Sequence, residues 1–112
     1  MALFDDRIQV LKVDGVTVGE FDQSADGFYR NVMTFNFNVK KKKAIRVKIR
    51  SDNPVDVAVA NENGSSMAHK QSMKDGELGP VPTLDNREMG LFLGVYPGDK
   101  ATVSVEVWME KP

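Results

Sequence analysis

The chain of 112 residues contains no cysteine and a single histidine, His69. The lack of cysteine excludes disulfide bonds, thiolate nucleophiles and thiolate metal sites. A single histidine leaves carboxylates to supply most ligands of a zinc ion, which disfavours zinc as well. The formal net charge is -1 at pH 7. The chain as a whole therefore presents no strong field to nucleic acid or to a membrane surface.

Long apolar runs are also lacking. No stretch approaches the roughly 18 apolar residues of a membrane span, and Asp5 and Asp6 lie where a signal peptide would need an apolar segment. We therefore expect a cytoplasmic protein without membrane insertion. The length predicts a single domain over residues 1–112, with residues 1–7 as an N-terminal arm that is either flexible or packed against the domain.

The pattern that dominates the chain from residue 29 onward is the alternation of apolar and polar residues. Ile45, Val47 and Ile49, for example, alternate with charged residues over the run 44–50. A period of two buries one face of a strand and cannot form the apolar stripe of a helix. We predict an all-β fold, a small antiparallel two-sheet β-sandwich of the jelly-roll kind with seven or eight strands. Its core is predicted to contain Phe35, Phe37, Ile45, Val47, Val57, Leu93 and Val105.

Turn residues predict how these strands connect. Asp14 and Gly15 separate two β-branched runs and predict a hairpin within 7–21. The lysines at 40–43 predict a turn that pairs strand 29–39 with strand 44–50. The segment Ser51 to Pro54 is predicted to separate strand 44–50 from a further strand, 55–60, which ends in an Asn-Gly turn.

Two later segments complete the prediction. An edge strand follows residue 65, and the glycines and prolines of 74–86 predict an irregular segment. Residues 89–109 predict a closing hairpin with Val95 opposite Val103 and Trp108 opposite Gly90.

The outward face of this closing hairpin would carry an aromatic row, formed by Phe92, Tyr96 and Trp108. Such a row can bind a sugar ring, a peptide or another subunit, because contiguous exposed aromatics are uncommon on monomers. Alternatively, the N-terminal arm or the segment before Met89 covers the aromatic row, and we give the two interpretations equal weight.

Several of these segments resemble the pre-peptidase C-terminal and GOLD-like β-sandwich domains. The resemblance lies in the aromatic strand 29–39, the basic strand 44–50, the run 54–64 that ends in Asn-Gly, and the last two strands, 90–96 and 101–109. It implies a non-catalytic binding or accessory module, and it carries over no catalytic residue.

A basic patch is the strongest local charge feature of the sequence. It could bind phosphate groups, but it is better explained as a solvated face that prevents edge-to-edge aggregation, because no aromatic residue lies beside it to stack bases. Nucleic acid is therefore not an expected partner. The patch contains Lys40, Lys41, Lys42, Lys43, Arg46, Lys48 and Arg50.

Metal and catalytic sites are weakly supported. Carboxylates in or beside turns suit calcium, but they lack the spacing of a calcium loop, and turns favour aspartate for backbone reasons; they are Asp22, Asp26, Asp52, Asp56, Glu62 and Asp99. A hydrolase would need His69 as general base beside Ser65, Ser66 or Ser72, and no Gly-x-Ser-x-Gly motif is present. We predict no metal, no cofactor and no enzymatic activity.

The sequence thus specifies no reaction. We predict a binding or accessory module that acts through protein contact or self-association as a homo-oligomer. A carbohydrate-binding module is the alternative, and a hydrolase that uses His69 is less favoured. The predicted contact residues are Phe92, Tyr96, Trp108, Glu106, Met67 and His69.

Overall fold

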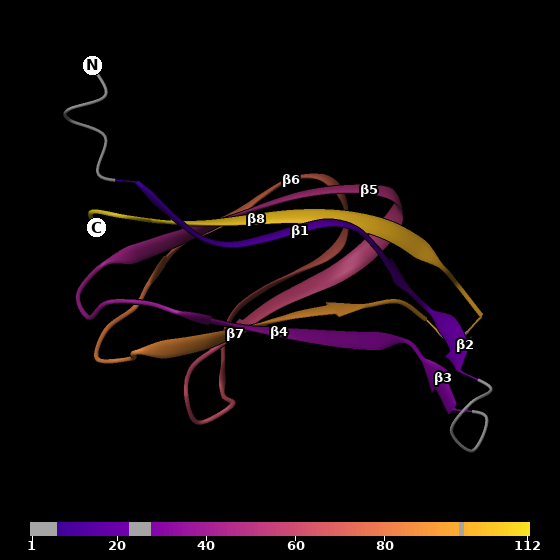
Figure 1. Cartoon of the computed structure of the whole chain (residues 1–112), viewed down its shortest axis with the longest axis horizontal. Helices are drawn as coiled ribbons and strands as arrows, with labels where there is room; N and C mark the ends of the chain where they lie inside the picture. The colour runs from indigo at the N-terminus through magenta and orange to yellow at the C-terminus, as the bar shows by residue number, and fades with distance from the viewer. Residues whose placement is uncertain (1–6, 23–27, 97) are drawn as a thin grey trace.

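The computed structural model describes residues 7–22, 28–96 and 98–112 (Figure 1). Within these residues the secondary structure is entirely β, and every strand pairing is antiparallel, as predicted. The predicted arm at 1–7 lies outside this description except for Arg7. The strands are β1 (Ile8–Val18), β2 (Glu20–Asp22), β3 (Phe28–Arg30), β4 (Val32–Asn38), β5 (Ala44–Ala60), β6 (Ser66–Pro82), β7 (Glu88–Gly94) and β8 (Ala101–Glu110).

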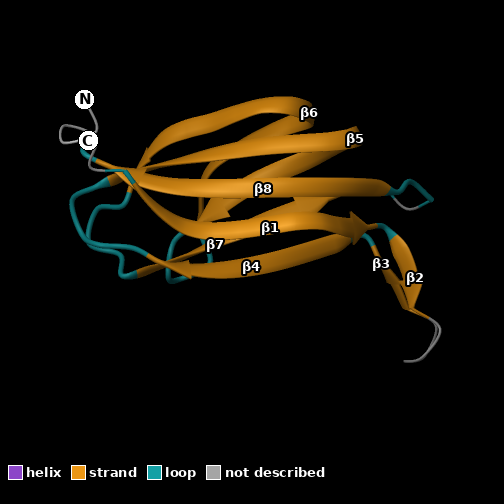
Figure 2. Cartoon of the chain, turned by 45° about the horizontal axis from the view of Figure 1, so that its top comes forward, coloured by secondary structure: helices purple, strands orange, loops and turns teal. Residues whose placement is uncertain are grey.

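Six of the strands form one continuous sheet in the order β1-β8-β5-β7-β4, with β6 paired to β5. The first half of β5 pairs with β8 and its second half pairs with β7. Because β5 belongs to both halves, the sheet curls over into an almost closed barrel (Figures 1 and 2), whereas two separate sheets were expected. The β2–β3 ribbon projects from one end (Figure 2).

A bulge in β5 produces this change of neighbour. Residues 51–54 have only one β6 residue opposite them, because Arg50 pairs with Asp75 and Val55 pairs with Met73. Pro54 has no N–H to donate and is tolerated in a strand at such a bulge. The sequence Ser51 to Pro54 was predicted to separate two strands, but it bends a single strand of 17 residues.

The Asp-Gly pair near the N-terminus also forms a bulge, so the hairpin predicted there is wrong. Val13 pairs with Val105 and Val16 pairs with Val103, which leaves Asp14 and Gly15 inserted in a continuous β1. Gly15 has a φ of 65°, and its N–H donates to Ser104 Oγ at 3.0 Å. A glycine with positive φ is required by this kind of bulge as much as by a hairpin turn.

The two other predicted pairings are wrong as well. β4 pairs with β7 instead of β5, and β7 and β8 do not pair with each other. With β5 between them, β7 and β8 each have a hydrogen-bonded neighbour on both edges. A terminal hairpin would leave one edge of its last strand unpaired, and backbone groups strongly favour pairing.

The segment predicted to be irregular is largely strand, because β6 extends to Pro82. Among the described residues β6 pairs only with β5, so it is an edge strand as predicted, and prolines on a free edge cost no ladder hydrogen bond. Gly79 has a φ of 128°, and a Cβ at this position would lie 2.7 Å from the carbonyl oxygen of Ile45. Glycine therefore lets β6 approach β5 closely.

The predicted core is confirmed. Six of the seven residues belong to one buried cluster that includes the inner faces of both halves of the sheet, and Phe35 is half-buried against it. The alternation therefore identified correctly which side of β4, β5, β7 and β8 faces inward.

Candidate functional site

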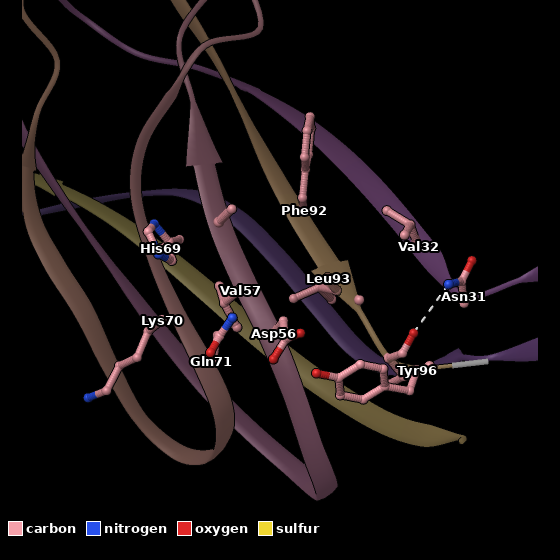
Figure 3. Close-up of a pocket in the computed structure, with 13 residues that line it drawn as sticks. Asn31, Val32, Asp56, Val57, His69, Lys70, Gln71, Phe92, Leu93 and Tyr96 are labelled. Carbon is pink, nitrogen blue, oxygen red and sulfur yellow. Dashed lines mark hydrogen bonds between the residues drawn. The ribbon is translucent and has the colours of Figure 1, made fainter. Parts of the chain in front are cut away.

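A groove lies on the outer face of the half of the sheet formed by β4, β7, β5 and β6. Its volume is about 360 Å³. We call it the Phe92–Tyr96 groove, and Figure 3 shows its lining side chains. It is lined by Asn31, Val32, Asp56, Val57, Ala58, His69, Lys70, Gln71, Phe92, Leu93, Gly94, Val95 and Tyr96.

The register of the strands explains the groove. Ala58 on β5 stands between Phe92 on β7 and His69 on β6. Gly94 stands between Val32 on β4 and Asp56 on β5. Opposed residues of antiparallel strands project from the same face. Two small residues on the central strands therefore form the floor, and larger side chains on their neighbours form the walls.

The apolar wall is held in place by local contacts. The Phe92 ring leans on Gly90, where a Cβ would lie 3.4 Å from ring carbon Cε1. Tyr96 begins a turn in which Asp99 N–H donates to its carbonyl oxygen at 2.9 Å. Asn31 accepts a hydrogen bond from Val95 N–H at 2.9 Å and returns one from its side chain, shown as a dashed line in Figure 3. The backbone that presents Tyr96 is thus tied to the start of β4.

Tyr96 and Val32 make this wall unusual. Their exposed fractions are 72% and 55%, and they are two of the four large hydrophobic residues that are exposed in the described part of the chain. Scattered exposed apolar residues are ordinary, but a contiguous patch around a concavity marks an interaction site.

Asp56 supplies a carboxylate beside this wall. Its Oδ1 accepts a hydrogen bond from Ser72 N–H at 3.0 Å. Among the described residues no lysine, arginine or histidine forms an ion pair with Asp56. A second hollow of about 530 Å³ adjoins the groove and also contacts Asp56 and Tyr96. Asp56 therefore lies where the two hollows meet.

His69 lies across the groove from Phe92 (Figure 3). It is exposed, and no hydrogen bond joins it to a serine in the described part of the chain. The geometry of a nucleophile and its base is therefore not assembled. Met67 does not line the groove; it is half-buried and its sulfur accepts a hydrogen bond from Asn86 Nδ2 at 3.9 Å.

Trp108 is not part of the aromatic wall, so the predicted aromatic row does not form. It lies on β8 between Gln9 on β1 and Arg46 on β5, and it is half-buried by its own chain. The row was inferred from pairing β7 with β8, and the two strands pair with different halves of β5. Glu106 is likewise on β8 and does not line the groove.

The basic patch is interleaved with carboxylates. Lys48 stands between Glu106 on β8 and Glu77 on β6, and Lys12 stands on the far side of Glu106. We call this row the charge ladder: Lys12, Glu106, Lys48 and Glu77. Such cross-strand neighbours of opposite sign offset one another.

The two arginines of the patch also have acidic neighbours, and the backbone of the lysine turn is held by Thr83. Arg50 stands opposite Asp75. Arg46 Nε donates to Glu110 Oε1 at 2.9 Å, and this carboxylate also lies 3.6 Å from Arg7 Nη2. In the lysine turn at 40–43, Thr83 Oγ1 donates to the Lys40 carbonyl oxygen at 2.6 Å and accepts from Lys43 N–H at 2.8 Å. The arrangement favours the solvated-face interpretation.

Two of the candidate calcium carboxylates accept hydrogen bonds from the backbone. Asp52 Oδ1 accepts from Thr102 N–H at 2.8 Å, as Asp56 does from Ser72. Asp26 lies outside the described residues. Within the described ranges no three histidine, aspartate or glutamate side chains gather as they would around a metal ion.

Sequence reasoning missed the floor of the groove. Asp56 was noted only as a turn carboxylate, and Ala58 and Gly94 were not considered. The sequence does show small residues at outward positions of these two strands. They form a floor only because β5 pairs with β7, and these strands are far apart in the sequence.

Comparison with known proteins identifies no family. The sequence matches no family model and no curated protein. Among solved structures, PliG of Aeromonas hydrophila, a periplasmic inhibitor of g-type lysozyme, matches with 14% identity and a TM-score of 0.59, over 98% of this chain and 91% of that one. The CBM36-1 domain of a xylanase from the hindgut metagenome of Trinervitermes trinervoides matches with 13% identity and a TM-score of 0.45, over 96% and 98%.

The PliG match shows a shared fold and nothing about activity. The CBM36 match is too distant to support an argument. Neither match tests the resemblance to pre-peptidase C-terminal and GOLD-like domains, which stays a prediction. In the described residues no helix is long and apolar enough to span a membrane.

Proposed function

We propose that this chain is a non-catalytic module that binds a segment of a partner protein in the Phe92–Tyr96 groove. The observation that supports the proposal best is the clustering of Tyr96 and Val32, both exposed, around a concavity whose floor is formed by small residues. Aromatic anchors of this kind dominate the binding energy of protein interfaces.

Two further points support a protein partner. In the described part of the chain β6 pairs only with β5 and borders the groove, so an extended segment that leaves the groove over β6 could hydrogen-bond to the unpaired edge of that strand. PliG is a lysozyme inhibitor that shares the fold, so the fold can support recognition of a protein. Homo-oligomer formation and a cytoplasmic location stay predictions.

The test is a selection of peptides from a random displayed library on the purified protein. Ala58→Leu fills the floor of the groove, and Thr102→Leu, an outward substitution on β8, is the matched control. We expect enriched peptides that bind the parent and the Thr102→Leu variant, with at least about a tenfold loss on Ala58→Leu, because a well-packed anchor is worth about 1.4 kcal/mol or more.

Two outcomes would overturn the proposal. One is the absence of any peptide that distinguishes Ala58→Leu from Thr102→Leu. The other is binding of β-linked glucose, xylose or N-acetylglucosamine oligosaccharides that Ala58→Leu abolishes, which would make the groove a carbohydrate site.

A further inference from the structure

The structure assigns a more specific ligand to one corner of the groove. We infer that Asp56 and Tyr96 together bind a guanidinium group, so that the partner segment carries an arginine beside its apolar anchor. This inference rests on the proposed function, because it names the chemistry of the segment that the groove accepts.

The first argument is the placement of the two side chains. Asp56 stands directly opposite Gly94, and Tyr96 follows Gly94 by two residues. Since Gly94 has no side chain, nothing on β7 lies beside Asp56 in its own row. Figure 3 shows the Tyr96 ring turned toward Asp56, with its hydroxyl on the Asp56 side. A flat cation between them would contact both groups.

The second argument is the charge of the corner. An ionised carboxylate has about four acceptor positions, and Asp56 uses one for Ser72 N–H. Lys70 on β6 also lines the groove and is exposed, but Figure 3 shows its amine directed away from Asp56. Asp99 and Lys100 also line the second hollow and carry opposite charges. Lys70 thus lines the groove without forming an ion pair with Asp56, and the carboxylate keeps acceptor positions for a cation of the ligand.

The third argument distinguishes a guanidinium from an ammonium. A guanidinium can donate two parallel hydrogen bonds to a carboxylate while its face stacks on an aromatic ring. A contact of this kind over an exposed tyrosine strengthens binding about two- to fivefold. Lysine would reach Asp56 only as a hydrated point charge and would gain less from the Tyr96 ring.

The experiment is a titration followed by two-dimensional ¹⁵N NMR at pH 7.5, with N-acetyl-arginine amide as the probe and N-acetyl-citrulline amide as its neutral isostere. We expect saturable shifts of the Ser72, Gly94 and Tyr96 amides with a dissociation constant of about 1–10 mM. Asp56→Asn keeps an acceptor for Ser72 N–H and should weaken binding at least about tenfold, as should replacing arginine by citrulline. Tyr96→Leu should weaken it about two- to fivefold.

Failure of this inference and failure of the proposed function have different signatures. No saturable shift up to about 50 mM, or equal shifts with the citrulline compound, would overturn the guanidinium site. If displayed peptides still depend on Ala58 but carry no fixed arginine, the guanidinium site is wrong and the peptide groove stands. If the arginine compound binds through Asp56 but no peptide depends on Ala58, the proposed function is wrong.

Discussion

The pairing of β8 with β5 can be tested directly because the chain has no cysteine of its own. Glu106 stands opposite Lys48, and both side chains are on the outer face. Opposed residues in antiparallel strands have Cα atoms about 4.5–5.5 Å apart, and disulfides span about 4.4–6.8 Å. A Lys48→Cys/Glu106→Cys variant should therefore oxidise to an internal disulfide.

The structure also sets the size of the effect. The cross-link closes a loop of 58 residues, the difference between positions 106 and 48. The chain-entropy relation then gives about 4 kcal/mol of stabilisation as an upper bound. For a domain of this size that corresponds to a rise in melting temperature of up to about 15 °C. Titration of free thiols and melting of the oxidised and reduced forms measure both quantities.

The matched control uses the alternative topology. In the closing hairpin inferred from sequence, with Trp108 opposite Gly90, Glu106 would stand opposite Phe92. Phe92→Cys/Glu106→Cys should therefore keep both thiols free, since β7 and β8 pair with different halves of β5. Rapid internal oxidation of this control, with free thiols in the Lys48 pair, would refute the observed strand order.

Two further predictions concern the core and the charge ladder. Phe37 is 4% exposed, so Phe37→Ala should lower the free energy of unfolding by about 3–5 kcal/mol. Phe35 is on the same face of β4 but only half-buried, so Phe35→Ala should lower it clearly less. Denaturant unfolding measures both losses, and equal losses would contradict the difference in burial. Glu106→Lys places like charges between Lys12 and Lys48 and should destabilise by about 0.5–2 kcal/mol. The difference in unfolding free energy between Glu106→Lys and the neutral control Glu106→Gln should become smaller in 0.5 M salt. If salt leaves this difference unchanged, charge repulsion is not its cause.

The face of each strand could be predicted from sequence because it depends only on local alternation. Leu91, Leu93 and Val95 are all buried, while Phe92 and Tyr96 between and beyond them face outward, as predicted. No knowledge of the neighbouring strand was needed for this result. A period of two records which side of a strand is apolar.

Strand neighbours could not be predicted in the same way. Asp14-Gly15 satisfies the backbone of a bulge as well as that of a tight turn, and only the continuation of β1 along β8 distinguishes the two. Similarly, Pro54 can end a strand or occupy a bulge. The outcome depended on β5 pairing with three strands, which is a non-local property.

The same non-local pairing explains why the groove escaped prediction while its aromatic wall did not. Phe92 and Tyr96 are visible in sequence as outward aromatics, but the space beside them exists only because Ala58 and Gly94 stand on adjacent strands. β5 can bring Asp56 and Ala58 beside β7 only after the bulge at 51–54 has released it from β8. Asn53 Nδ2 donates to the Lys100 carbonyl oxygen at 2.8 Å, which ties that bulge to the start of β8. The bend that closes the core is therefore also the feature that creates the Phe92–Tyr96 groove.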